Sequence, residues 1–189
     1  MNPFRRAHPA QWHWADPRTA EQTGHALIDG LQRADKRDPD RPDWQFRGYE
    51  DVVLTLAGAR VIVEPAAQAH SVPGADPFEL AGSLVALSSD LYYVEGFALA
   101  DCGSEWDGVP IRHAWTVDRR GLLVDHCAPS GGTRTVAYLG VPFAWPLVER
   151  LRDHHECSSV FDADAKGGSD MLRNGVRQDQ RGVVWAFAS

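Results

Sequence analysis

The sequence predicts an α+β fold in which helices pack on an antiparallel sheet of four to five strands. Four β-like runs fill the middle of the chain, and their connections are short and rich in Gly, Asp and Pro, which indicates an antiparallel meander. These runs are Leu91–Ala100, Ile111–Asp118, Leu122–Cys127 and Thr135–Leu139. Apolar residues at helical spacing stand on both sides of them. With 189 residues and 43% hydrophobic composition, the chain is long enough to bury a core without disulfides or metal.

Residues 1–75 are expected to form an N-terminal arm and helices. Residues 1–16 contain Trp12 and Trp14 among prolines and polar residues, so we interpret them as the arm. Asp16-Pro17 has the form of an N-cap followed by proline at the first helical position, and a helix is predicted from there to about residue 34. After a charged loop over 35–43, a second helix is predicted over Tyr49–Ala57, and Val61–Val63 is predicted to be a short strand or a buried extended piece.

Residues 76–143 are expected to form the core, which a further helix begins. Asp76-Pro77-Phe78-Glu79 combines the D-x-x-E pattern of a capping box with proline at N1, so a helix is predicted from Asp76 to about Ser88. The meander follows this helix.

Residues 144–189 complete what we expect to be a single domain over 1–189. They contain a predicted helix over Trp145–His155, a polar stretch with a short helix near Met171, and a last strand over Arg181–Phe187.

The composition argues against several classes of function. The formal net charge is −7, whereas a nucleic-acid-binding protein normally carries a basic stripe. No apolar run is long enough for a membrane span, and the residues after Met1 lack the apolar segment of a secretory signal. The cysteines are Cys102, Cys127 and Cys157, an odd number without a pairing motif, which is typical of a reducing compartment. We therefore expect a cytoplasmic protein that binds neither nucleic acid nor membrane. No cofactor motif is recognisable.

Three ionisable residues lie inside otherwise apolar strands: Glu95, His113 and Asp125. Such groups are costly to bury without a partner, so we expect them to interact around a shared hollow. Whether His113 meets Asp125 depends on the turn Asp118–Gly121. A three-residue loop with Gly121 in the left-handed conformation would place both side chains on one face, within reach of each other. A two-residue loop would place them on opposite faces.

The order of these segments resembles the papain-like and transglutaminase-like cysteine enzymes. The runs that carry the resemblance are Tyr93-Val-Glu-Gly-Phe-Ala98, His113-Ala-Trp115 through Asp125, and Tyr138-Leu-Gly-Val-Pro-Phe143. They are similar to a group of uncharacterised phage and bacterial proteins whose segments read roughly YVEGYA, HAWLVD, VIDPT and YFGVPF. The resemblance covers about residues 76–143 and implies a helix, then a strand, then a strand opened by histidine, then a strand that ends in an acid.

The resemblance implies that His113 is a general base and that Asp125 orients its ring. The substrate would be an amide, ester or thioester, in the form of a small molecule, a peptide or a carrier-linked acyl group. The family's nucleophilic cysteine would stand at the start of the helix, but this position holds Asp76-Pro77-Phe78 here. Cys102 and Cys127 are the remaining weak candidates for the nucleophile.

Metal sites are disfavoured by the spacing of the potential ligands. His154 and His155 in Asp153–Cys157 point about 100° apart on a helix, and both HExxH and Cys-x2-Cys spacing are absent. A mixed site that adds His126 to Glu95, His113 and Asp125 is disfavoured because strand alternation turns His126 away from Asp125. We expect no bound metal.

Three functions remain open. The first is an acyl-transfer or hydrolytic enzyme in which His113 and Asp125 act with an unidentified nucleophile, while Glu95 polarises or binds the substrate. The second is a non-catalytic binding module that retains the fold and the polar pocket. The third is a thiol-independent acid–base enzyme that acts on a small molecule. An alternative role for Glu95, apart from these functions, is to brace an arginine such as Arg112 or a buried backbone amide.

Overall fold

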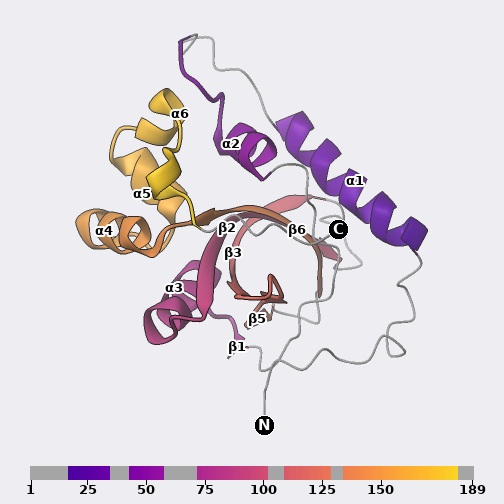
Figure 1. Cartoon of the computed structure of the whole chain (residues 1–189). Helices are drawn as coiled ribbons and strands as arrows, with labels where there is room; N and C mark the ends of the chain where they lie inside the picture. Colours follow the sequence, from indigo (N-terminus) through magenta and orange to yellow (C-terminus); the bar gives the residue numbers. More distant parts are fainter. Residues whose placement is uncertain (1–16, 35–42, 58–71, 102–108, 129–133, 183–189) are drawn as a thin grey trace.

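The computed structural model describes residues 17–34, 43–57, 72–101, 109–128 and 134–182 (Figure 1). It is an α+β structure in which helices surround the outside of a curled, four-stranded antiparallel sheet. The expected α+β class is therefore confirmed. The predicted arm at 1–16, the strand at 61–63 and most of the last strand lie outside the described residues.

The helices before residue 156 agree closely with their sequence signals, whereas a helix over 160–166 was not predicted. The helices are α1 (Pro17–Ala34), α2 (Tyr49–Leu56), α3 (Pro77–Leu87), α4 (Trp145–His155), α5 (Val160–Lys166), α6 (Asp170–Asn174) and the 3-10 turn η3 (Gln178–Gln180). Helix α3 begins as expected, because the Asp76 side chain accepts hydrogen bonds from Phe78 N and Glu79 N. No helix of the described segments is long and apolar enough to cross a membrane.

The strands are β1 (Val72–Pro73), β2 (Leu91–Asp101), β3 (Pro110–Asp118), β4 (Leu123–Val124), β5 (Cys127–Ala128) and β6 (Arg134–Phe143). The main sheet has the order β4-β3-β2-β6, so the predicted meander is wrong at its last step. The run expected over Leu122–Cys127 breaks at Asp125, and β5 leaves the sheet to pair in parallel with β1. The chain then returns along the opposite edge, where β6 pairs with β2.

Alternation along β2 divides the packing into two cores. Tyr93, Phe97 and Leu99 face the helices in the larger outer core. Val94 and Ala98 face the inside of the curl. The inner cluster is small and consists of Val94, Ala98, Trp115, Val117, Leu123 and Tyr138.

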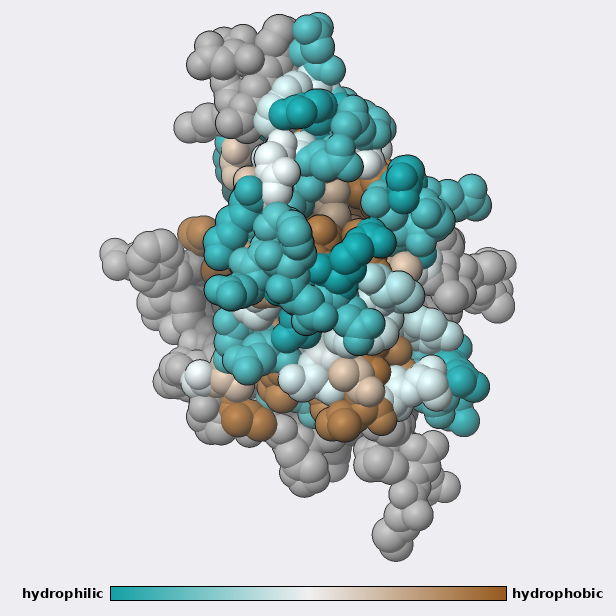
Figure 2. All heavy atoms as spheres, turned by 90° about the vertical axis from the view of Figure 1, so that its left-hand side faces the viewer, coloured by the Kyte–Doolittle hydropathy of each residue, from teal (hydrophilic) through white to brown (hydrophobic). Residues whose placement is uncertain are grey.

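The outer face is held to the helices by polar contacts as well. Tyr49 on α2 donates a hydrogen bond of 3.0 Å to Asp164 on α5. Burial, together with the charge of Asp164, raises the pKa of Tyr49 above its usual range. Figure 2 shows the side on which α3 to α6 lie as largely hydrophilic, with hydrophobic residues gathered in its lower part. Leu87 at the end of α3 is the most exposed large hydrophobic residue described, at 86%.

Candidate functional site

The turn between β3 and β4 sets the geometry of the inner face. Gly121 N donates to Asp118 O at 2.9 Å, and Asp118 N donates to Leu122 O at 2.9 Å. Gly121 has a φ of 76°, a left-handed conformation that favours glycine. The ladder pairs Thr116 with Val124, and its continuation sets residue 115 opposite Asp125. Of the two loops considered for Asp118–Gly121, the structure therefore has the three-residue loop.

This register brings His113 and Asp125 together. His113 Nε2 lies 2.8 Å from Asp125 Oδ2, and the two residues are only 5% and 3% exposed. A carboxylate can only accept hydrogen bonds, so Nε2 carries the proton of this bond. In the neutral ring the lone pair is then on Nδ1, which makes no hydrogen bond with the described residues. In this geometry Asp125 fixes the ring, and Nδ1 is the nitrogen that could accept a proton.

Asp125 is itself fixed by two further donors. Tyr138 Oη donates to Oδ2 at 2.9 Å, and Cys127 N donates to Oδ1 at 2.9 Å. The second bond turns the chain out of the strand, which is the physical reason why β4 ends before Asp125. Tyr138 is a site residue that sequence reasoning missed. Its signal was the strand alternation, which places it on the inner face of β6.

The sheet beside His113 lacks side chains on the inner face. The strand pairing sets His113 opposite Gly96, and Gly96 opposite Gly140. A Cβ on Gly140 would lie 2.5 Å from Trp115 Cη2 and 2.8 Å from Cζ2, so the indole covers this glycine. The rings of His113 and Trp115 are stacked, with centroids 6.2 Å apart. The imidazole therefore stands among aromatic rings and bare backbone.

Glu95 lies on the other face of the sheet. It pairs with Ala114 while the neighbouring Gly96 pairs with His113, and adjacent strand positions point to opposite faces. The expectation that Glu95, His113 and Asp125 share one hollow is therefore wrong for Glu95. The structure brings together only the histidine and the aspartate.

Five donors surround the fully buried Glu95 carboxylate. Oε2 accepts from Tyr93 Oη and Val160 N, both at 2.7 Å. Oε1 accepts from Ser159 Oγ at 2.6 Å, Phe161 N at 3.2 Å and Arg112 Nη2 at 3.3 Å. Burial raises the pKa of Glu95 above its ordinary value, and these hydrogen bonds partly offset the rise. Glu95 thus caps the first turn of α5 from the sheet.

Arg112 completes this outer cluster. Its Nη1 lies 2.6 Å from Asp162 Oδ1, and its Nη2 donates to Ser159 Oγ at 2.7 Å. The guanidinium also lies within 6 Å of the ring centroids of Tyr49, Phe78 and Phe161. The alternative in which Glu95 braces Arg112 describes the observed contacts.

Of the two cysteines considered as nucleophiles, Cys102 lies outside the described residues. Cys127 sits beside the start of α3, where its thiol donates to Ala75 O at 3.2 Å. Burial and the charges of Asp125 and Asp76 raise the pKa of the Cys127 thiol. A thiol in this setting is a poor nucleophile, because the thiolate is the reactive form.

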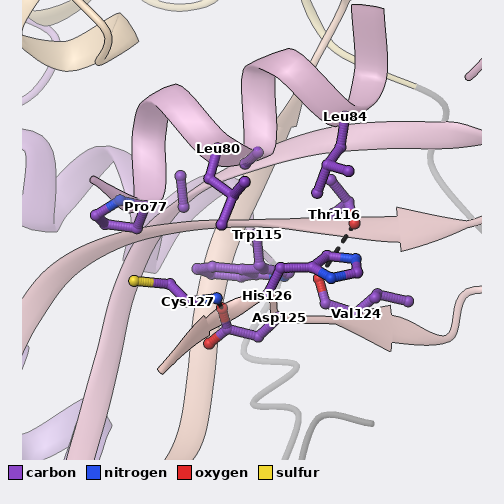
Figure 3. A pocket seen from close by; sticks show the side chains of 11 residues that line it. Pro77, Leu80, Leu84, Trp115, Thr116, Val124, Asp125, His126 and Cys127 are labelled. Atoms are coloured by element: carbon purple, nitrogen blue, oxygen red, sulfur yellow. Dashed lines mark hydrogen bonds between the residues drawn. The ribbon is translucent and has the colours of Figure 1, made fainter. Parts of the chain in front are cut away.

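A small cavity separates α3 from the strands below it (Figure 3). The space open to the centre of a water molecule is about 10 Å³, which is room for roughly one water. Figure 3 shows Trp115 beneath the helix, with Asp125 and Cys127 close to its indole. Pro77, Leu80 and His126 also line the cavity.

Metal ligands do not converge in the part of the chain that the structure describes, where no group of three or more His, Cys, Asp or Glu residues could hold an ion. His154 and His155 instead contact each other edge to face, with ring centroids 4.6 Å apart.

Comparisons with family models, with curated proteins and with solved structures gave no match.

Proposed function

We propose that the chain is an acid–base enzyme that hydrolyses an ester, thioester or amide with His113 as the general base and Asp125 as its orienter. The observation that carries the proposal is the 2.8 Å contact between His113 Nε2 and an Asp125 carboxylate that Tyr138 and the Cys127 amide also hold. A ring fixed in this way keeps Nδ1 available for a proton.

The reaction needs water as its second substrate. As the water oxygen bonds to the acyl carbon, His113 Nδ1 takes one of its protons, and Asp125 stabilises the resulting imidazolium. When the bond from the acyl carbon to the leaving heteroatom breaks, the imidazolium returns the proton to that heteroatom. The products are a carboxylic acid and an alcohol, thiol or amine. An alcohol or amine in place of water would give acyl transfer.

Water is a better candidate than a thiol on two grounds. The start of α3, where the resemblance would place a cysteine, is occupied by Asp76 acting as N-cap and by Pro77. The Cys127 thiol is bonded to Ala75 O, and its pKa is raised. Glu95 has no part in this mechanism because it lies on the outer face.

A binding module without catalytic activity is the second candidate. It is favoured by the burial of His113, which is 5% exposed, and by the occupied helix start. In this case the His113–Asp125 pair would hold β3 and the chain after β4 together.

The experiment measures hydrolysis of p-nitrophenyl acetate and of acetyl thioesters by four proteins: the unmodified chain, His113→Gln, Asp125→Asn and a variant with all three cysteines replaced by alanine. His154→Gln is the matched control, because His154 is exposed on α4. We expect His113→Gln to lose about 100-fold or more in kcat/KM. The cysteine-free variant and His154→Gln should keep their activity.

Equal turnover by the unmodified chain and His113→Gln, with both proteins folded, would refute the enzyme and leave the binding module. Activity that disappears only in the cysteine-free variant would contradict the role of water and restore a thiol nucleophile.

A further inference from the structure

The indole of Trp115 carries a buried polar group that no described residue satisfies. Its Nε1–H has no hydrogen-bond partner within the described segments, and the residue is 2% exposed. Buried indole N–H groups usually find an acceptor, because leaving one unpaired costs free energy. A donor kept unpaired beside a candidate site suggests that its acceptor arrives with a ligand.

The Asp125 carboxylate lies close to the indole but accepts from His113, Tyr138 and Cys127 N instead. The Tyr138 ring meets the indole edge-on, with centroids 5.2 Å apart. Trp115 therefore adjoins the His113–Asp125 pair without sharing its hydrogen bonds.

The orientation of the indole is set by the sheet beneath it. Its Cζ2 and Cη2 atoms lie over Gly140, and any side chain on that glycine would collide with them. Nε1 is bonded to Cε2, which is bonded to Cζ2, so the N–H lies on the same edge of the indole as Cζ2. The unpaired N–H is thus held on the edge of the indole that covers the bare backbone next to His113.

The surroundings limit what the acceptor can be. Val94, Ala98, Val117 and Leu123 form the inner cluster with Trp115, so a charged acyl group would be buried without a partner.

We propose that Trp115 Nε1–H donates to the carbonyl oxygen of an uncharged acyl group, and so selects uncharged substrates such as acetyl esters for the reaction at His113. This inference rests on the proposed function. It adds a residue that contacts the substrate and a substrate class.

The test compares Trp115→Phe with Trp145→Phe, which removes an indole from the start of α4 on the helix side. We expect Trp115→Phe to lose about tenfold or more in kcat/KM for p-nitrophenyl acetate, as for one lost hydrogen bond to the substrate. Trp145→Phe should match the unmodified chain. The unmodified chain should also prefer the acetate ester to p-nitrophenyl succinate, whose acyl group is charged.

A second measurement does not depend on turnover or on a stable variant. Among the seven indole N–H resonances of the ¹⁵N-labelled chain, the one in contact with the Tyr138 ring should move downfield and saturate as acetamide is added. Methylammonium, which offers no acceptor, should leave it unchanged.

The results separate the two proposals. If His113→Gln loses activity while Trp115→Phe keeps it, the inference about Trp115 is overturned and the enzyme stands. If His113→Gln keeps activity, the proposed function fails, and a still saturable acetamide shift would retain Trp115 as a carbonyl-binding group. An indole resonance that does not respond to acetamide overturns the inference in either case.

Discussion

Replacing Glu95 by glutamine removes a charge from the centre of the contacts between the sheet and α5. The carboxylate accepts hydrogen bonds from Tyr93, Ser159 and Arg112 and from the amides of Val160 and Phe161. Each of its two oxygens accepts a hydrogen bond from one of these two amides. Glutamine has the same shape but keeps only one oxygen, so one amide of α5 must face an NH2 group whichever way the side chain is turned.

The cost follows from these contacts. An unpaired buried amide costs about 1–3 kcal/mol. The bond from Arg112 also loses the assistance of the opposite charge, which adds roughly 1 kcal/mol. We therefore expect Glu95→Gln to lower the free energy of unfolding by about 2–4 kcal/mol. Glu95→Ala, which removes the acceptor that all five donors share, should lower it by about 3–5 kcal/mol or more.

Urea unfolding followed by tryptophan fluorescence measures these differences. Glu149→Gln is the matched control because Glu149 is exposed on α4, and it should change the stability by no more than about 0.5 kcal/mol. If Glu95→Gln is as stable as Glu149→Gln, the view of Glu95 as the cap of α5 is wrong. Under the proposed function, folded Glu95→Gln should also retain its turnover.

Three further results are expected. Because burial raises the pKa of Glu95 above 4.5, protonation favours the folded state, so the stability gap between the unmodified chain and Glu95→Gln should widen as the pH falls from neutral toward 4.5; a constant gap would contradict this. Iodoacetamide should label Cys127 more slowly at neutral pH than it labels a cysteine peptide, because the pKa of this thiol is raised. Peptide mass spectrometry measures both rates, and equal or faster labelling of Cys127 would contradict the prediction. Gly140→Ala should lower the free energy of unfolding by about 1–3 kcal/mol, since its Cβ would lie 2.5 Å from Trp115 Cη2, and an unchanged denaturation midpoint would argue against that packing.

The pairing of His113 with Asp125 could be predicted because the loop between their strands is short. Asp118 and Gly121 have strong turn preferences, and a defined turn fixes the register of both strands. The face occupied by Glu95 could not be predicted in this way. The connection from Asp101 to Pro110 is long, and long loops leave the register between two strands undetermined.

Other differences have local causes. The break at Asp125 depends on its carboxylate accepting from Cys127 N, a contact that an apolar strand pattern does not reveal. Helix α5 was missed within a polar stretch, although Ser159 and Asp162 have the S-x-x-D spacing of a helix start. The Ser159 hydroxyl does accept from Asp162 N. The unpaired N–H of Trp115 has no sequence signal, because it depends on which acceptors surround it in space.

The partner that caps α5 lies 64 to 66 positions earlier in the chain. A seven-residue helix is too short to persist alone in water, so its first turn gains its acceptor only after β2 has taken its place. Contacts between such distant positions form slowly, because closing the intervening length of chain costs entropy. Assembly should therefore begin with the strands, and the helices that follow β6 should dock late, once β2 has brought the Glu95 carboxylate into place.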